Sequence, residues 1–239
     1  MATGKRHAKR TSLWLAAVMF LIGSGLVLMG LTQNSSVTRL SEAATRGMTA
    51  ESVQAATKKV QAEREQGKVD PFNYEKTSQL TPLAVAGYGI RELTGTSDYG
   101  AVGQIRVPAV GLDLPIGIGV GNAVLVRGAG TLKADQRMGQ GNYALAGHYM
   151  TTKRLLFSPL KGVRKGDSVY LTDKRQVYRY RVTRVQVIDR HKVDVIDDVP
   201  GKKLVTLITC NSARRGEPKR LVVQGELQSV KAAKVGIKS

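Results

Sequence analysis

Cys210 and His148 could form a reactive thiol–imidazole pair, and each lies at the end of an apolar run. Cys210 is the only cysteine in the 239 residues, and it ends residues 204–210, whose β-branched side chains predict a buried strand. His148 follows a second apolar run, residues 143–147. A thiol is nucleophilic as the thiolate, and a nearby imidazole favours that form. Two strand ends can therefore place a cysteine–histidine pair, although a lone cysteine is also often a small buried hydrophobe.

A cation close to Cys210 would complete such a site. Arg220 opens the last apolar segment, residues 220–227, whereas Arg214 and Arg215 are expected in an exposed loop. If this segment pairs with the one that ends at Cys210 as a hairpin, Arg220 lies across from the thiol. A guanidinium there can hold a substrate carbonyl or the oxyanion of an acyl intermediate. The alternative, one more surface arginine in a basic domain, stays open.

The other candidate ligands do not predict a metal or a cofactor. His7 lies in the basic N-terminal segment, and His191 lies in a charged turn where a solvated role is expected. One cysteine and one outer histidine do not supply the three or four ligands that zinc needs. The acidic residues Asp194, Asp197 and Asp198 could attract Ca²⁺ loosely, but a solvated turn is the simpler interpretation.

Residues 12–31 contain no charged side chain, and four Lys or Arg and no acid precede them. Twenty helical residues at ~1.5 Å each span the ~30 Å hydrocarbon core of a bilayer. A cleaved secretory signal is the alternative, but its apolar region is usually ~7–15 residues long and ends at a small-x-small site. Residues 32–36 offer no such site. We expect a retained, single-pass membrane anchor with a cytoplasmic N-terminus and an extracellular catalytic domain.

The charge belongs mainly to the second half of the chain. Residues 101–239 carry 25 basic and 10 acidic side chains, within a total net charge of +19. This excess suits an anionic surface such as lipid headgroups or an envelope polymer. Nucleic acid is not an expected partner, because the domain is predicted outside the membrane and carries no basic motif interleaved with aromatic residues.

The segments before residue 100 are predicted to connect the anchor to the folded domain. Residues 41–66 are rich in Ala, Glu, Lys and Gln and end at Gly67, which predicts a juxtamembrane helical spacer. Residues 68–100 contain two X–Pro pairs and several glycines, which predicts an extended, turn-rich lead-in.

From about residue 103 the pattern changes to short β segments separated by Gly, Asp and Asn. The fold class predicted is all-β, an eight-stranded barrel with short helical turns near residues 151–160 and 193–199, after a transmembrane helix and a helical spacer. The predicted strands are residues 104–107, 112–116, 123–127, 142–147, 168–171, 177–188, 204–209 and 221–227.

These motifs resemble those of a known family. Thr206-Leu207-Ile208-Thr209-Cys210 is similar to the TLxTC signature of the sortases, and residues 141–148 resemble their histidine motif. Arg220 occupies the place of the family arginine, at the start of the strand after the cysteine. The likeness covers roughly residues 72–228. Further segments similar to class A sortases are residues 114–116 and 128–132.

The resemblance implies a fold and a reaction. Class A sortases are cysteine transpeptidases on the surface of Gram-positive bacteria, built on an eight-stranded barrel. The resemblance implies that Cys210 attacks the Thr–Gly bond of an LPxTG-type sorting signal and that His148 acts as acid and base. Arg220 would orient the peptide and stabilise the oxyanion, with Thr209 and Ala146 also contacting the substrate. The surface protein would pass to an amine of a lipid-linked peptidoglycan precursor.

The rival interpretations are a sortase of another class, a hydrolytic cysteine peptidase, and a non-enzymatic basic module that binds envelope polymers. Calcium activation is not expected, because Asp113 stands almost alone among basic residues in the early part of the domain. The predicted organisation is a cytoplasmic lead (1–11), the anchor (12–31), a spacer (32–71), the catalytic domain (72–228) and a basic tail (229–239).

Overall fold

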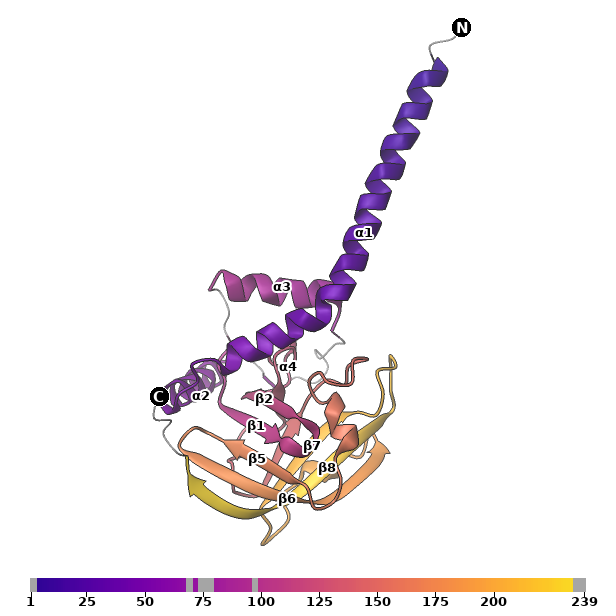
Figure 1. The fold of residues 1–239 in the computed structure, drawn as a ribbon. Helices are drawn as coiled ribbons and strands as arrows, with labels where there is room; N and C mark the ends of the chain where they lie inside the picture. Colours follow the sequence, from indigo (N-terminus) through magenta and orange to yellow (C-terminus); the bar gives the residue numbers. More distant parts are fainter. Residues whose placement is uncertain (1–3, 68–70, 73–79, 96–98, 234–239) are drawn as a thin grey trace.

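The computed structural model describes residues 4–67, 71–72, 80–95 and 99–233. Within these ranges the chain forms a closed barrel of eight strands in the order β1-β2-β3-β4-β7-β8-β6-β5. Helices pack on one side of the barrel, and a long N-terminal helix extends away from it (Figure 1). The predicted eight-stranded β-barrel with short helical turns is confirmed.

Alternating side chains of the strands fill the barrel. Ile105, Leu145, Tyr180 and Leu207 are among the fully buried residues of the core. Strands β4 and β7 pair in parallel, and β7, β8 and β6 pair antiparallel in sequence around the barrel. The strands are β1 (Gly103–Val107), β2 (Leu112–Gly117), β3 (Ala129–Thr131), β4 (Asn142–Ala146), β5 (Ser168–Thr172), β6 (Gln176–Asp189), β7 (Leu204–Cys210) and β8 (Lys219–Ala232).

One predicted strand is wrong. Residues 123–127 were expected to be extended, but α4 (Asn122–Leu125) forms there and β3 follows it. The helical turn brings the carbonyl of Ala123 to the guanidinium of Arg127, whose Nη1 donates to it at 2.8 Å. The apolar run therefore buries its side chains from a helical turn. The other short helices are η2 (Pro108–Val110), η3 (Ser158–Gly162) and η4 (Asp194–Ile196); the last two lie where helical turns were predicted.

Three helices precede the barrel. Helix α1 (Gly4–Thr45) and helix α2 (Ala50–Glu65) cover the predicted helical spacer, with a break between them. Thr49 begins α2, because its hydroxyl accepts from the backbone N of Ser52 at 3.2 Å while the Ser52 hydroxyl accepts from the backbone N of Thr49 at 2.9 Å.

Helix α3 (Pro82–Leu93) corrects the prediction of an extended lead-in over residues 68–100. The Thr81 hydroxyl accepts from the backbone N of Ala84 at 3.2 Å, and Pro82 occupies the first helical turn. A threonine cap followed by proline is a favourable helix start, because proline lacks only an N–H that would have no partner in the helix.

Residues 12–31, the predicted membrane anchor, lie within α1. Across the described part of the chain, no helix meets both the length and the apolarity required to cross a membrane. The anchor is therefore not confirmed and stays a prediction.

A buried arginine connects α3 to the barrel. The side chain of Arg127 is 1% exposed, and its Nη2 lies 2.8 Å from Oε2 of Glu92 in α3. The guanidinium also lies 5.0 Å from the ring centroid of Tyr99. A buried charge held by a carboxylate and an aromatic ring fixes the position of the helix that supplies the carboxylate. Nothing in the sequence pattern had pointed to this ion pair.

Candidate active site

The parallel pairing of β4 and β7 brings His148 and Cys210 to the same level of the barrel. Ala146 pairs with Ile208, and the backbone N of Gly147 donates to the carbonyl of Ile208 at 3.1 Å. His148 and Cys210 each lie two residues beyond this pair. Because side chains two residues apart share a face of a strand, both project on the outer side of the barrel.

Arg220 and Ile188 extend this row across two more strands. Arg220 of β8 lies directly opposite Cys210, as the predicted hairpin requires, and Ile188 of β6 lies opposite Arg220. Directly opposed residues of antiparallel strands have neighbouring side chains on one face. The sheet therefore presents a histidine, a thiol and a guanidinium in register.

These side chains line one cavity of about 670 Å³ on the outer face of the barrel. The segment between β6 and β7, residues 190–203, forms one wall, and the connection between β2 and β3 forms another. The loop after β7, residues 211–218, completes the rim. The apolar lining residues of the walls are Val120, Leu125, Leu132, Val193, Val195 and Ile196.

The imidazole of His148 is half-buried, and one of its two nitrogens lacks a hydrogen-bond partner among the described residues. Its Nε2 is shielded from solvent and has no hydrogen-bond partner among the described residues. Burial disfavours the charged imidazolium and lowers the pKa of His148 from 6.5 to about 4. At neutral pH the ring is therefore neutral, and Nε2 is available to a ligand that enters the groove.

Gly147 lets the backbone before His148 lie close to the core. The carbonyl of His148 accepts from the backbone N of Phe157 at 3.0 Å, and the Phe157 ring is fully buried. A Cβ added at Gly147 would lie 2.5 Å from that ring. Glycine at this position therefore lets the chain pass close to Phe157 and carry His148 onto the outer face.

Cys210 is a free, half-buried thiol, and Arg220 beside it is partly committed to its own loop. Nη1 of Arg220 donates to the carbonyl of Glu217 at 2.6 Å and to that of Lys219 at 3.2 Å. These are the hydrogen bonds recorded for this guanidinium within the described ranges, so Nε and Nη2 are left to donate elsewhere. Arg214, which is exposed, also lines the cavity.

The two predicted substrate-contacting residues differ in their surroundings. Ala146 is half-buried and lines the cavity. Thr209 also borders the cavity, but its side chain is 2% exposed, and its hydroxyl donates to the carbonyl of Gly147 at 2.8 Å. The Thr209 hydroxyl thus connects the ends of β4 and β7. Contact of either residue with substrate stays a prediction.

Asn142 is a structural residue of the site that sequence reasoning missed. It is buried at the start of β4, and its Nδ2 donates to the carbonyls of Val195 and Asp197 at 3.1 and 3.0 Å. Its Oδ1 accepts from the hydroxyl of Thr206 at 2.7 Å. Asn142 therefore fixes the groove wall between β6 and β7. No sequence pattern marks this amide, because its partners Val195 and Asp197 lie more than fifty residues away along the chain.

Asp198 and Asp113, two of the acidic residues considered for calcium, are engaged by other groups. Among the described residues, no three His, Cys, Asp or Glu side chains are grouped in a way that could hold a metal ion. Asp198 accepts from the backbone N of Asn142 at 2.8 Å and pairs with Lys133. These hydrogen bonds lower the pKa of Asp198, with the Lys133 contribution the larger. Asp113 forms an ion pair with Arg106 at 3.2 Å.

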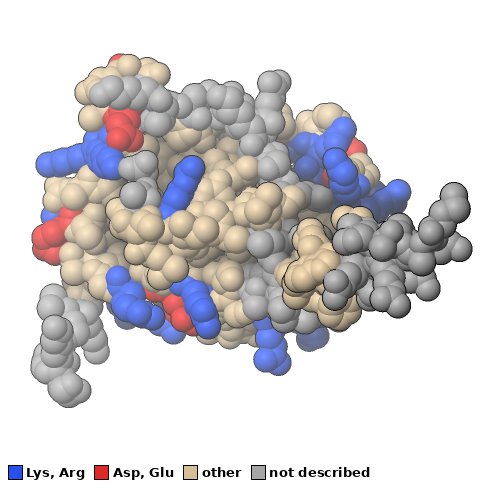
Figure 2. Space-filling view, turned by 90° about the horizontal axis from the view of Figure 1, so that it is seen from above, with Lys and Arg blue, Asp and Glu red and all other residues tan. Residues whose placement is uncertain are grey.

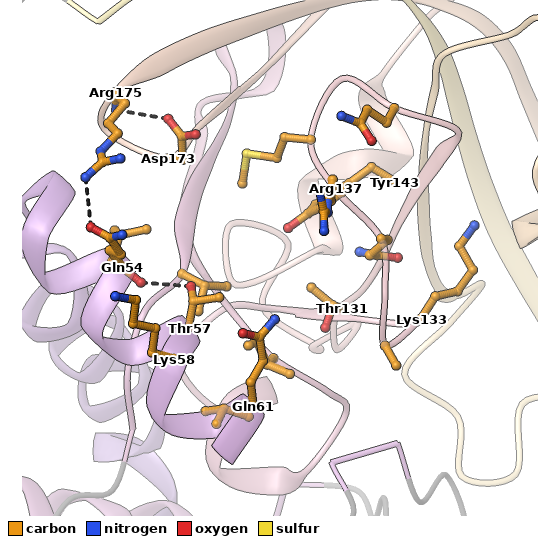
Figure 3. Close-up of a pocket in the computed structure, with 18 of the residues that line it drawn as sticks. Gln54, Thr57, Lys58, Gln61, Thr131, Lys133, Arg137, Tyr143, Asp173 and Arg175 are labelled. Atoms are coloured by element: carbon orange, nitrogen blue, oxygen red, sulfur yellow. Dashed lines mark hydrogen bonds between the residues drawn. The ribbon is translucent and has the colours of Figure 1, made fainter. Parts of the chain in front are cut away.

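A second cavity, of about 520 Å³, lies between α2 and the barrel (Figure 3). Amide and basic side chains face each other across it, and Nη2 of Arg175 donates to Oε1 of Gln54 at 2.8 Å. Its lining contains neither cysteine nor histidine, so it lacks the thiol and imidazole that the groove brings together. Labelled residues are Gln54, Thr57, Lys58 and Gln61 of α2 and Thr131, Lys133, Arg137, Tyr143, Asp173 and Arg175 of the barrel.

The fold and the groove define a β-barrel protein with the parts of a thiol-dependent enzyme. The family model of the Sortase domain matches residues 105–228, which contain the groove and nearly all of the barrel. The chain belongs to the sortase family.

Its relatives include sortase A proteins. The chain is 44% identical over 140 residues to sortase A of Streptococcus agalactiae, an alignment that covers 56% of each chain. It is 42% identical over 139 residues to sortase A of Listeria monocytogenes, which covers 57% of this chain and 62% of the relative. The aligned segment thus spans about three fifths of these curated relatives.

Solved structures agree with this assignment. The crystal structure of Listeria monocytogenes sortase A matches with a TM-score of 0.55 at 42% identity and covers 56% of this chain and 92% of that one. Sortase C-1 of Actinomyces oris matches with a TM-score of 0.53 at 25% identity and covers 75% of this chain and 99% of that chain. The predicted resemblance to sortase A is confirmed.

Proposed function

We propose that this chain is a membrane-anchored transpeptidase of the sortase A type. It cleaves an LPxTG-type sorting signal between Thr and Gly and transfers the surface protein to an amine of a lipid-linked cell-wall precursor. The observation that supports this most strongly is the row formed by His148, Cys210 and Arg220 in one groove. The shielded, unpartnered Nε2 of His148 adds a proton-transfer group to that row.

In the first half-reaction Sγ of Cys210 attacks the carbonyl carbon of the threonine. A C–S bond forms, the C–N bond to glycine breaks, and the leaving amine needs a proton. Because burial lowers the pKa of His148 to about 4, the resting ring is neutral and the thiol supplies this proton. Nε2 takes it from the thiol and passes it to the amine, so the imidazolium exists only transiently.

Arg220 stabilises the charge that develops on the substrate oxygen. The guanidinium lies opposite Cys210 in the β7–β8 register, and Nε and Nη2 are free to donate toward the groove. A fixed cation at the point where negative charge appears stabilises the transition state more than the ground state.

In the second half-reaction an amine attacks the thioacyl carbon. The C–N bond forms, the C–S bond breaks, and the proton lost by the amine returns through His148 to the thiolate. The apolar walls of the groove, among them the buried Val120 and Leu125, limit the access of water to the intermediate. An amine that is held in the groove is then the preferred acceptor.

The proposed organisation rests on the basic and apolar segments at the N-terminus. Residues 1–11 are cytoplasmic, residues 12–31 anchor the chain, and residues 32–71 connect the anchor to the catalytic domain, residues 72–228. The catalytic domain lies on the extracellular side, where surface proteins and wall precursors meet. Its excess of Lys and Arg suits the anionic envelope.

The test uses the full chain in detergent with a fluorogenic LPxTG-type peptide and an amine acceptor. Cys210→Ala and Cys210→Ser should each lower turnover by about 10³-fold or more, because the nucleophile is lost even when its volume is kept. Equal turnover of wild type and Cys210→Ala would reject Cys210 as the nucleophile, and no turnover by either protein would favour a binding module. Mass spectrometry should find the peptide–amine product; mainly free carboxylate would identify a hydrolytic peptidase instead.

A further inference from the structure

Helix α3 carries apolar residues on two faces, and one of these faces is exposed. Val85 is buried in the hydrophobic core cluster, whereas Leu83, Ile90 and Leu93 are 72%, 62% and 89% exposed. The spacing of seven and three residues places these three side chains along one strip of the helix. A contiguous exposed apolar strip on a soluble domain marks a surface that another apolar phase covers.

A second exposed apolar surface lies on the helix that packs against α3. Helix α1 packs against α3, and the part of α1 that extends away from the barrel exposes Trp14, Met19 and Phe20. In Figure 1, α3 lies across the side of the barrel from which this part of α1 projects. A partner that covers both the strip on α3 and the exposed part of α1 must be apolar and large enough to reach both helices.

The charge around the strip is basic. Seen from above, uncharged side chains fill much of the middle of the view, and Lys and Arg, with fewer Asp and Glu, project mostly around them (Figure 2). Arg91 of α3, next to Ile90, is exposed. An apolar strip bordered by cations fits the acyl chains and headgroups of an anionic bilayer better than it fits a second copy of a chain with net charge +19.

The same side of the molecule carries the rim of the catalytic groove. Nδ2 of Asn34 in α1 donates to the hydroxyl of Thr152, four residues after His148, at 2.7 Å. The ion pair between Glu92 of α3 and Arg127 holds α3 on α4, whose Leu125 lines the groove. Figure 1 shows the loop between β7 and β8 on this side as well.

We propose that the strip formed by Leu83, Ile90 and Leu93 lies in the interfacial layer of an anionic lipid bilayer, so that the groove containing Cys210 opens beside the membrane surface. This inference rests on the proposed membrane location of the chain and adds a second contact to it. The Arg127–Glu92 pair transmits the position of α3 to the groove wall. An acceptor with a lipid tail would then reach the thioacyl group while its tail remains in the bilayer.

The test measures the depth of single labels in the full chain. Because Cys210 is the only cysteine, a Cys210→Ala background accepts one spin label at Ile90→Cys or at Leu93→Cys. Val230→Cys is the matched control, since Val230 is also an exposed apolar residue and lies on β8 near the end of that strand. The chain is reconstituted in vesicles of phosphatidylglycerol and phosphatidylcholine, and thermal unfolding confirms that each variant is folded.

Labels at positions 90 and 93 should be accessible to oxygen and protected from a water-soluble nickel chelate, and the label at 230 should show the reverse. Equal nickel accessibility at positions 90 and 230 would overturn the proposal. Spin–spin broadening between labels at position 90 of different molecules would also overturn it, because a second copy would then cover the strip.

The membrane anchor is tested separately in the same vesicles. Trp14, the only tryptophan, reports on α1 through quenching by brominated lipids. Quenched Trp14 with solvent-accessible labels at positions 90 and 93 would keep the anchor and reject the contact of α3. Unquenched Trp14 with protected labels would support the contact of α3 and reject the anchor.

Discussion

The two ends of the strand pair β4–β7 differ in whether their buried polar groups have hydrogen-bond partners. At the beginning of the strands Asn142 and Thr206 are buried and hydrogen-bonded, and Nε2 of Gln224 donates to the Thr206 hydroxyl at 3.1 Å. At the other end, Nε2 of His148 is shielded from solvent without a partner in the described ranges, and the thiol of Cys210 is free.

This difference separates structural polarity from reactive polarity. A satisfied buried network makes the fold more rigid, whereas an unsatisfied buried group costs ~1–3 kcal/mol and persists where something else requires it. The network of Asn142 holds the groove wall in place. At the opposite end, Nε2 of His148, which has no hydrogen-bond partner in the described part of the chain, is the group to which a substrate can bind.

Replacement of His148 should abolish most of the activity without lowering stability, which tests the reactive end of the strand pair. We expect His148→Leu to lower turnover of an LPxTG-type peptide by about 10²–10⁴-fold, because proton transfer to and from the amine is lost. The same change should leave thermal stability equal or higher, since it removes a buried nitrogen without a partner. Stability is measured by thermal unfolding and turnover by peptide cleavage. A stable variant with unchanged turnover would remove His148 from the mechanism.

Replacement of Asn142 should have the opposite profile. Asn142→Leu leaves the carbonyls of Val195 and Asp197 and the hydroxyl of Thr206 without this partner. We expect a loss of about 2–3 kcal/mol in the free energy of unfolding by urea, and a smaller fall in turnover than His148→Leu causes. The matched control, Gln224→Leu, changes the half-buried edge of the same network and should cost less. Unchanged stability of Asn142→Leu would show that the network is dispensable.

The sequence predicted the reactive end more completely than the structural end. Cys210 and His148 could be found because rare residue types end apolar runs, and Arg220 because a hairpin places it opposite Cys210. Asn142 could not, since its partners at Val195 and Asp197 lie more than fifty residues away along the chain and in a loop.

The errors in the fold prediction have a similar origin. Residues 81–93 begin with a Thr–Pro pair and contain two glycines, a pattern typical of turns, whereas Thr81 caps a helix that the ion pair of Glu92 with Arg127 holds in place. Residues 123–127 have strand-like apolar residues, but the buried guanidinium of Arg127 requires the carbonyl of a helical turn. In both cases tertiary contacts outweighed local propensity.

A glycine substitution sharpens the comparison by disturbing only the reactive end. Gly147→Ala would press a methyl group into the ring of Phe157, which is fully buried and cannot move freely. We expect a loss of about 1–3 kcal/mol in the free energy of unfolding. Turnover should fall as well, because His148 follows directly in the chain. Gly121→Ala is the matched control, since a Cβ there meets nothing within 4 Å and its φ is −61°. Equal effects of the two substitutions would contradict the close approach.

The smallest expected effect is on the pH dependence of stability. Burial lowers the pKa of His148 to about 4 in the folded state, from 6.5 in the absence of burial. The unfolded chain therefore binds the proton more tightly, so stability is undiminished above the pKa of 6.5 and falls as the pH decreases from there toward about 4.

At about pH 5.5 the loss that His148 causes should be about 1 kcal/mol relative to about pH 7.5. Urea unfolding of wild type and His148→Leu at both pH values measures it. On acidification, His148→Leu should lose the free energy of unfolding that the other titrating groups contribute, but not the part that His148 contributes. If the two proteins lose the same free energy on acidification, the imidazole of His148 is solvated in the folded state. The contrast between the two ends of the strands would then reduce to the hydrogen bonds of Asn142.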